Sequence, residues 1–131
     1  MKTQTLIGLQ TRLQIIEIKR HPRGFFFYNK EVDVNMKEIN VNEIDRVVDS
    51  IIIDVREDYE LEETGTIKGA IHIPMNEVPN RLNDIPKDRE IYILCRSGVR
   101  SYNVAKYLNQ IGYDAINLDG GIINYKGDLV K

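Results

Sequence analysis

Cys95 is the only cysteine in the sequence, and it opens a short stretch that also holds two arginines and a glycine. This stretch reads Cys95-Arg96-Ser97-Gly98-Val99-Arg100-Ser101. Arginine side chains are permanently charged, and backbone amides around a glycine can turn inward to form a concavity that binds anions. Cysteines in such settings have a pKa of about 3.5–7.5 instead of about 8.5, because the thiolate is stabilised. The spacing therefore predicts a thiolate nucleophile beside a site for an anionic substrate.

Two elements must hold this loop in place. Residues 91–94 are apolar, with β-branched and aromatic side chains, which is typical of a buried strand. After Ser101 the apolar residues recur every three or four positions, which indicates a helix that ends near Gly112. The unpaired N–H groups at a helix N-terminus would stabilise a thiolate further. A lone cysteine is more often a small packing residue, but two arginines, a glycine and a helix start within six positions favour the reactive cysteine.

From Met36 onward, strand patterns alternate with helix patterns. We expect five strands, over 37–39, 51–55, 70–73, 91–94 and 115–118. We also expect a helix capped by Asn40 or Asn42 and three short helical segments, over 57–63, 76–82 and 120–125. The helix that follows Asn40 or Asn42 would have an apolar face of Ile44, Val47 and Val48. The segment 76–82 would face inward with Val78 and Leu82, whereas the charges of 57–63 would be solvated. This pattern predicts an α/β fold with a mostly parallel sheet flanked by helices.

The expected sheet also locates the site. Ligands bind at the carboxyl ends of parallel strands, and both Cys95 and Asp54 stand at or near such ends. Asp54 and Arg56 lie on the same side of their strand, because side chains alternate along a strand. They would either form a structural ion pair or line the site.

Four segments in order resemble those of rhodanese-like sulfurtransferases. The stretch from Cys95 to Ser101 resembles the active-site loop of that family, and 51–57 resembles its strand ending in Asp-Val-Arg. Residues 65–74 resemble the segment Gly-His-Ile-x-Gly-Ala-x-Asn-Ile-Pro, and 118–121 with Tyr125 resemble the closing Leu-x-Gly-Gly and tryptophan. The resemblance covers about 36–128. The sequence departs from the family pattern at Thr66, His72 and Tyr125, where the family often has histidine, asparagine and tryptophan.

The resemblance implies a three-layer rhodanese fold and a persulfide intermediate on Cys95 as the catalytic residue. It implies that the donor is held by the residues that follow, namely Arg96, Ser97, Gly98, Val99, Arg100 and Ser101. It gives Asp54 and Arg56 a supporting role beside the loop. Tyr125 is expected to pack in the core, and His72 to be a packed or solvated residue. No metal is expected, because one cysteine and two separated histidines, His21 and His72, are too few ligands for a usual site.

Other functions remain open at this point. Cysteine-dependent phosphatases and arsenate reductases also use a cysteine in an anion cradle, but they usually place five residues between cysteine and arginine, whereas four separate Cys95 from Arg100. A persulfide carrier or regulatory rhodanese module is a third possibility; regulatory modules commonly lose the cysteine. The leading hypothesis is sulfur transfer from thiosulfate or a similar donor to a thiol or cyanide, with a protein donor or acceptor as an alternative partner.

Composition limits the setting in which this chemistry takes place. The chain has 131 residues, which suits one domain, and its net charge of −2 gives no case for nucleic acid. A single cysteine excludes an internal disulfide and fits a reducing cytoplasm. No apolar run reaches the length of a membrane span, and the N-terminus lacks the pattern of a signal peptide. No cofactor motif for nucleotides is present.

Residues 1–35 differ from the remainder. Their net charge is +3, which leaves −5 for 36–131, and they contain the aromatic run from Phe25 to Tyr28. Because the family resemblance begins at Met36, we expect this segment to be an added leader outside the core. The alternatives, in order, are a partner-binding or self-association arm and, least favoured, attachment to a membrane surface, since its basic and apolar residues do not sort onto two faces.

Overall fold

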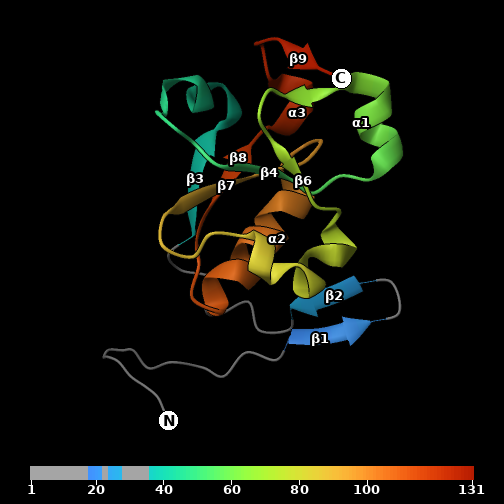
Figure 1. The fold of residues 1–131 in the computed structure, drawn as a ribbon, viewed down its shortest axis with the longest axis vertical. Helices are drawn as coiled ribbons and strands as arrows, with labels where there is room; N and C mark the ends of the chain where they lie inside the picture. Colours follow the sequence, from blue (N-terminus) through green and yellow to red (C-terminus); the bar gives the residue numbers. More distant parts are fainter. Residues whose placement is uncertain (1–17, 22–23, 28–35) are drawn as a thin grey trace. The chain divides into compact units, whose positions relative to one another are not determined.

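A computed structural model describes residues 18–21, 24–27 and 36–131. It divides into two units, Met1–Asn35 and Met36–Lys131. In the first unit, β1 (Ile18–His21) pairs antiparallel with β2 (Gly24–Phe27), with Ile18 opposite Phe27 (Figure 1). The other predictions for the N-terminal segment fall outside the described residues, so its role stays a prediction.

The second unit is built on a parallel sheet of five strands in the order β3-β8-β7-β4-β6. The strands are β3 (Lys37–Asn40), β4 (Ile52–Asp54), β6 (Ile71–His72), β7 (Glu90–Leu94) and β8 (Asp114–Asp119). The central strands β7 and β4 are almost wholly buried, as their continuous apolar sequences predict for a sheet covered on both faces. The expected α/β fold and its strands are therefore confirmed.

Helical segments cover the two faces of this sheet (Figure 1). On one face α2 (Val99–Gln110) packs against β7 and β8. On the other, the 3-10 helix η2 (Val41–Arg46) and the short α3 (Gly121–Asn124) meet the side chains that alternate along β7 and β8. The remaining helical segments are α1 (Asp58–Thr64) and the 3-10 helices η3 (Met75–Asn80) and η4 (Leu82–Asp84). The two covered faces give the three layers.

Three details differ from the sequence-based expectations. Val48 is 84% exposed and not part of an apolar face, because η2 ends at Arg46 and the chain then turns away toward β4. Leu82 is only half-buried. Two strands that were not expected, β5 (Thr66–Ile67) and β9 (Leu129–Val130), pair antiparallel in a small separate sheet.

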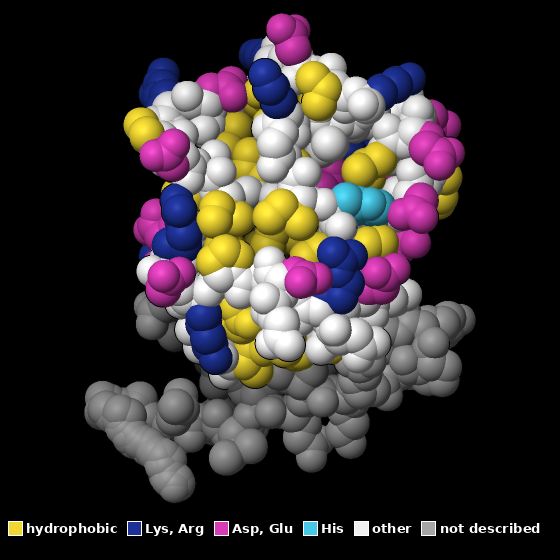
Figure 2. Space-filling view, in the orientation of Figure 1, with side chains coloured by type: hydrophobic (Ala, Val, Ile, Leu, Met, Phe, Trp, Pro, Cys, Tyr) yellow, Lys and Arg dark blue, Asp and Glu magenta, His cyan; other side chains and the backbone are white. Residues whose placement is uncertain are grey.

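The surface of α1 is acidic. Its exposed side chains include Asp58, Glu62 and Glu63, and Glu57 precedes it. In Figure 2, acidic side chains gather along the edge of the molecule where α1 lies in Figure 1. None of the described helices is long and apolar enough to cross a membrane.

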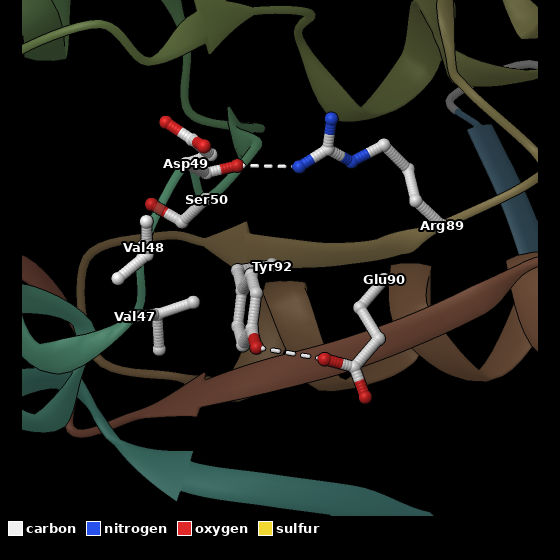
Figure 3. A pocket seen from close by; sticks show the side chains of 7 residues that line it. All are labelled: Val47, Val48, Asp49, Ser50, Arg89, Glu90 and Tyr92. Carbon is white, nitrogen blue, oxygen red and sulfur yellow. Dashed lines mark hydrogen bonds between the residues drawn. The ribbon is translucent and has the colours of Figure 1, made fainter.

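A shallow pocket of about 240 Å³ lies at the amino end of β7 (Figure 3). Its walls combine the apolar side chains of Val47, Val48 and Tyr92 with the polar or charged groups of Asp49, Ser50, Arg89 and Glu90. Arg89 donates a hydrogen bond to the backbone oxygen of Asp49, and the Tyr92 hydroxyl donates to Glu90 at 3.1 Å. This pocket is at the opposite end of β7 from Cys95.

Candidate active site

Cys95 lies directly after β7, at the carboxyl end of the central strand, and only 1% of it is exposed. Its sulfur accepts hydrogen bonds from the backbone N–H groups of Gly98 at 3.1 Å and Ser101 at 3.3 Å. The Ser101 hydroxyl is a further neighbour of the sulfur at 3.2 Å. Because Ser101 lies in the first turn of α2, the sulfur is at a helix N-terminus, where backbone N–H groups stabilise negative charge.

The carbonyl groups of the same loop point away from the sulfur. The Cys95 oxygen accepts from the N–H of Ile122 at 2.9 Å, and the Arg96 oxygen accepts from that of Ile123 at 3.1 Å. The Gly98 oxygen accepts from the side-chain amide of Asn117 at 3.2 Å. Since the carbonyl and N–H groups of a peptide point in opposite directions, these outer partners turn the N–H groups of Arg96, Ser97 and Val99 toward the inner side of the loop, beside the two that contact the sulfur. Asn117 and α3 are therefore parts of the cradle that the sequence analysis missed.

Two glycines make this geometry possible. Gly98 adopts a φ of 102°, a left-handed conformation that side chains other than glycine rarely adopt. Gly121 has a φ of 64°, and a Cβ atom there would lie 2.3 Å from the Arg96 oxygen. The conformation of Gly98 fits its expected place in the anion-binding loop, whereas the absence of a side chain at Gly121 lets α3 approach the loop closely.

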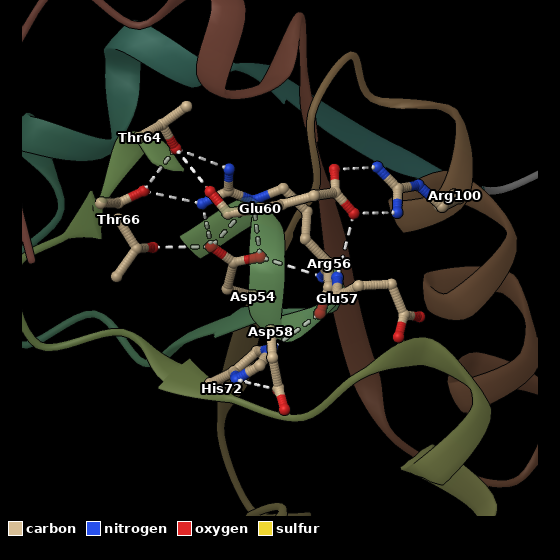
Figure 4. A network of polar contacts seen from close by, with 10 residues as sticks. Asp54, Arg56, Glu57, Asp58, Glu60, Thr64, Thr66, His72 and Arg100 are labelled. Carbon is tan, nitrogen blue, oxygen red and sulfur yellow. Dashed lines mark hydrogen bonds and ion pairs between the residues drawn. The ribbon is translucent and has the colours of Figure 1, made fainter. Parts of the chain in front are cut away.

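Among the other residues expected to bind substrate, three are exposed. Arg96 and Ser97 are exposed in the loop, and Val99 is 65% exposed at the first position of α2. The guanidinium of Arg100 instead pairs with Glu60, with Nη1 2.8 Å from Oε2 and Nη2 2.9 Å from Oε1 (Figure 4). Arg100 is therefore joined to α1, and its two terminal nitrogens are already occupied.

Glu60 corrects the expectation that the charges of α1 are solvated. It is only 8% exposed, because it turns toward the catalytic loop while its neighbours on α1 face solvent. Its Oε2 atom also accepts from the Glu57 N–H at 3.0 Å. The hydrogen bond from Arg100 is the main cause that lowers the pKa of Glu60 to about 2, so the carboxyl is ionised at neutral pH. The same bond raises the pKa of Arg100.

Asp54 and Arg56 form a second ion pair, and both are almost fully buried, at 0% and 1% exposed. Arg56 Nη2 lies 2.8 Å from Asp54 Oδ2, and the Nε atom contacts both carboxylate oxygens. Arg56 also donates to Thr64 Oγ1 and to the Gly65 oxygen, and Thr66 donates to Asp54 at 2.7 Å (Figure 4). These contacts make the pair structural: it fastens the turn between α1 and β5 to the end of β4.

His72 and Tyr125 have contacts away from the sulfur. The Nε2 atom of His72 lies 2.6 Å from the Arg56 oxygen, and its Nδ1 atom is 3.5 Å from a carboxylate oxygen of Asp58. The ring of Tyr125 packs beside the core, and its hydroxyl donates to Asp45 at 2.8 Å. Burial raises the pKa of Tyr125 to about 12, and the hydrogen bond to Asp45 adds to this rise. In residues 36–131, no three side chains of the metal-binding types lie close enough together to hold an ion.

The chain combines a parallel sheet flanked by helices with a cysteine loop at the carboxyl end of the central strand, and known proteins with similar sequences and structures support the same assignment. The family model for the rhodanese-like domain matches residues 32–128, so the chain belongs to the rhodanese-like sulfurtransferase family. A sulfurtransferase of Allochromatium vinosum is 44% identical over 93 residues, covering 63% of this chain and 86% of that protein.

Solved structures agree as well. The crystal structure of SSP1007 from Staphylococcus saprophyticus is 37% identical with a TM-score of 0.67, covering 73% of this chain and all of that one. A rhodanese-like domain protein from Staphylococcus aureus is 36% identical with a TM-score of 0.66, at 73% and 100% coverage. The resemblance noted in the four sequence segments is thereby confirmed.

Proposed function

We propose that this protein transfers a sulfane sulfur from thiosulfate or a similar donor to a thiophilic acceptor through a persulfide on Cys95. The observation that carries the proposal is the set of polar groups around one sulfur atom within 3.3 Å: two backbone N–H groups that donate to it and a hydroxyl that can donate to a thiolate. Such donors favour a thiolate and would equally stabilise the charge of a terminal persulfide sulfur.

The reaction would proceed in two half-steps. In the first, the Cys95 thiolate attacks the outer sulfur of thiosulfate; a new S–S bond forms, the old one breaks, and its electron pair leaves with sulfite. In the second, cyanide or a thiolate attacks the terminal sulfur and the Cys95 thiolate leaves. Because the two substrates react in turn, the kinetics would be ping-pong. The chemistry uses no metal or organic cofactor.

The partners are therefore a small sulfur donor and a thiol or cyanide, or a protein cysteine in place of either. A reducing cytoplasm would keep Cys95 in the thiol state that the first half-step needs. A persulfide carrier for another protein would use the same first half-step, and it differs only in what receives the sulfur.

The first half-step can be tested directly by mass spectrometry. After incubation with thiosulfate and removal of excess reagent, the intact protein should gain the mass of one sulfur atom on Cys95, and cyanide should remove it. Cys95→Ser should gain nothing and should show no thiosulfate:cyanide transfer, while its circular dichroism spectrum stays that of the wild type. Transfer that persists in Cys95→Ser would overturn the mechanism.

A further inference from the structure

The second arginine of the loop is not free to meet a substrate. Both terminal nitrogens of Arg100 are bonded to the two carboxylate oxygens of Glu60, an arrangement that is strong and strict in geometry. The side chain of Arg96, by contrast, is exposed, and the described residues offer it no ion pair. A negatively charged donor that approaches Cys95 therefore meets one unpaired arginine and one that is already neutralised.

The carboxylate that neutralises Arg100 is firmly held. Its side chain is only 10% exposed, its Oε2 atom accepts from the Glu57 N–H, and α1 fixes its backbone (Figure 4). The hydrogen bond to Glu60 is the largest cause that raises the pKa of Arg100, burial opposes the rise, and the nearby Cys95 adds a smaller electrostatic contribution to it. Arg100, whose guanidinium is thus bonded to the Glu60 carboxylate, lies one position before Ser101, whose N–H and hydroxyl contact the sulfur.

We infer that Glu60 is a specificity-determining residue: by occupying Arg100 it disfavours donors that bring two negative charges to Cys95 and favours donors that bring one or none. The physical reason is that like charges placed together in a partly desolvated site repel, and a donor with one negative charge instead of two meets about half of this repulsion. Thiosulfate is a dianion, so it meets the full repulsion. A persulfide, R–S–SH, does not.

This inference rests on the proposed function and specifies its donor class. With a persulfide donor, the Cys95 thiolate attacks the outer sulfur, an S–S bond to Cys95 forms, and the R–S bond to that sulfur breaks. The electron pair leaves with R–S⁻, and the proton stays on the transferred sulfur. Atoms and charge balance without an oxidant or reductant. The leaving thiolate carries one negative charge, where thiosulfate would release a sulfite dianion.

Two donors of nearly equal shape test the inference. Methanethiosulfonate differs from thiosulfate by a methyl group in place of one oxygen, and so it carries one negative charge instead of two. We expect Glu60→Gln to lower the KM for thiosulfate by about three- to fivefold, the worth of one partly exposed charge interaction. The KM for methanethiosulfonate should change less than about twofold. The matched control is Glu62→Gln, which removes one charge from the exposed face of the same helix.

Either an unchanged or a raised KM for thiosulfate in Glu60→Gln would overturn the inference, as would an equal fall in Glu62→Gln. A measurement on the wild type covers the case in which Glu60→Gln does not fold. At equal ionic strength, sulfate should protect Cys95 from iodoacetamide no better than methanesulfonate does, and markedly better protection by sulfate would contradict the inference. Failure of the proposed function looks different, because then neither donor would place a sulfur on wild-type Cys95.

Discussion

At the amino end of the central sheet, Lys37 lies 2.8 Å from Asp114 and 3.7 Å from Glu90, and all three side chains are about half exposed. At the carboxyl end, Asp54 and Arg56 pair at 2.8 Å with almost no exposure, and Glu60 pairs with Arg100 beside the catalytic loop. Exposed ion pairs contribute little because water solvates the separated charges well, whereas a buried charge that loses its partner is costly. The charges at the carboxyl end therefore matter most for both the fold and the chemistry.

The largest effect is expected when one buried charge at the carboxyl end of the sheet is removed. Arg56→Met would leave the Asp54 carboxylate buried without its main partner and without the bonds to Thr64 and Gly65. We expect this change to lower the free energy of unfolding by about 3–5 kcal/mol. Urea denaturation followed by circular dichroism measures it. A loss below about 1 kcal/mol would show that this pair behaves like an exposed one.

The next test disturbs the cradle without touching a charge. In Gly121→Ala the new Cβ would meet the Arg96 oxygen, so α3 should shift and release the carbonyls of Cys95 and Arg96. A displacement of this kind in the catalytic loop should lower kcat/KM on the order of tenfold to a hundredfold. Gly69→Ala is the matched control, since Gly69 has a similar φ of 86° but no atom within 4 Å of an added Cβ. Equal losses in both variants would show that backbone strain, and not contact with the loop, is responsible.

A third test uses pH to sharpen the contrast between the two ends. The pKa of Glu60 is lowered from 4.5 to about 2 by Arg100, so the pair stabilises the fold above about pH 4.5 and ceases to do so as the pH falls toward 2. We expect wild type to exceed Glu60→Gln in stability by about 1.5 kcal/mol at neutral pH, the low end of the range for charged hydrogen bonds because Arg100 is partly exposed. The difference should shrink steadily between those two pH values in thermal or urea unfolding. A difference that does not depend on pH would contradict the role given to the ionised carboxylate.

The smallest effect is expected at the amino end. Lys37→Met removes the same kind of charge as Arg56→Met but from an exposed cluster, so it should cost less than about 1 kcal/mol, and less still at high salt. Sulfur transfer should be unaffected, since Lys37 begins β3 at the end of the sheet far from the loop. A cost similar to that of Arg56→Met would remove the basis of the comparison.

Much of this arrangement could be predicted because it depends on neighbours in the sequence. A strand, a polar loop with Gly98 and the start of a helix are consecutive, so the N–H groups that reach Cys95 come from within six positions of it. The parallel sheet followed from the alternation of strand and helix patterns for the same reason.

The parts that were missed depend on contacts between distant segments. Glu60 was indistinguishable in sequence from the solvated acids around it, and only the packing of α1 against the loop brings it to Arg100, forty positions away. Asn117 was not singled out within the expected strand over 115–118, and its bond to Gly98 arises from the pairing of β8 with β7. Val48 was predicted to be buried because η2 was taken to be longer than it is.

The bonds from Ile122 and Ile123 to the loop have a consequence for how the protein is made. A ribosome adds residues from the N-terminus onward, so Cys95 and its helix are synthesised before the groups that hold the Cys95 and Arg96 carbonyls. Until α3 has emerged and docked, nothing turns those two carbonyls outward, and the nascent chain carries a cysteine without its finished cradle. We therefore expect the thiol to be slow to react with electrophiles on the ribosome and to gain its full reactivity only when α3 has docked against the loop.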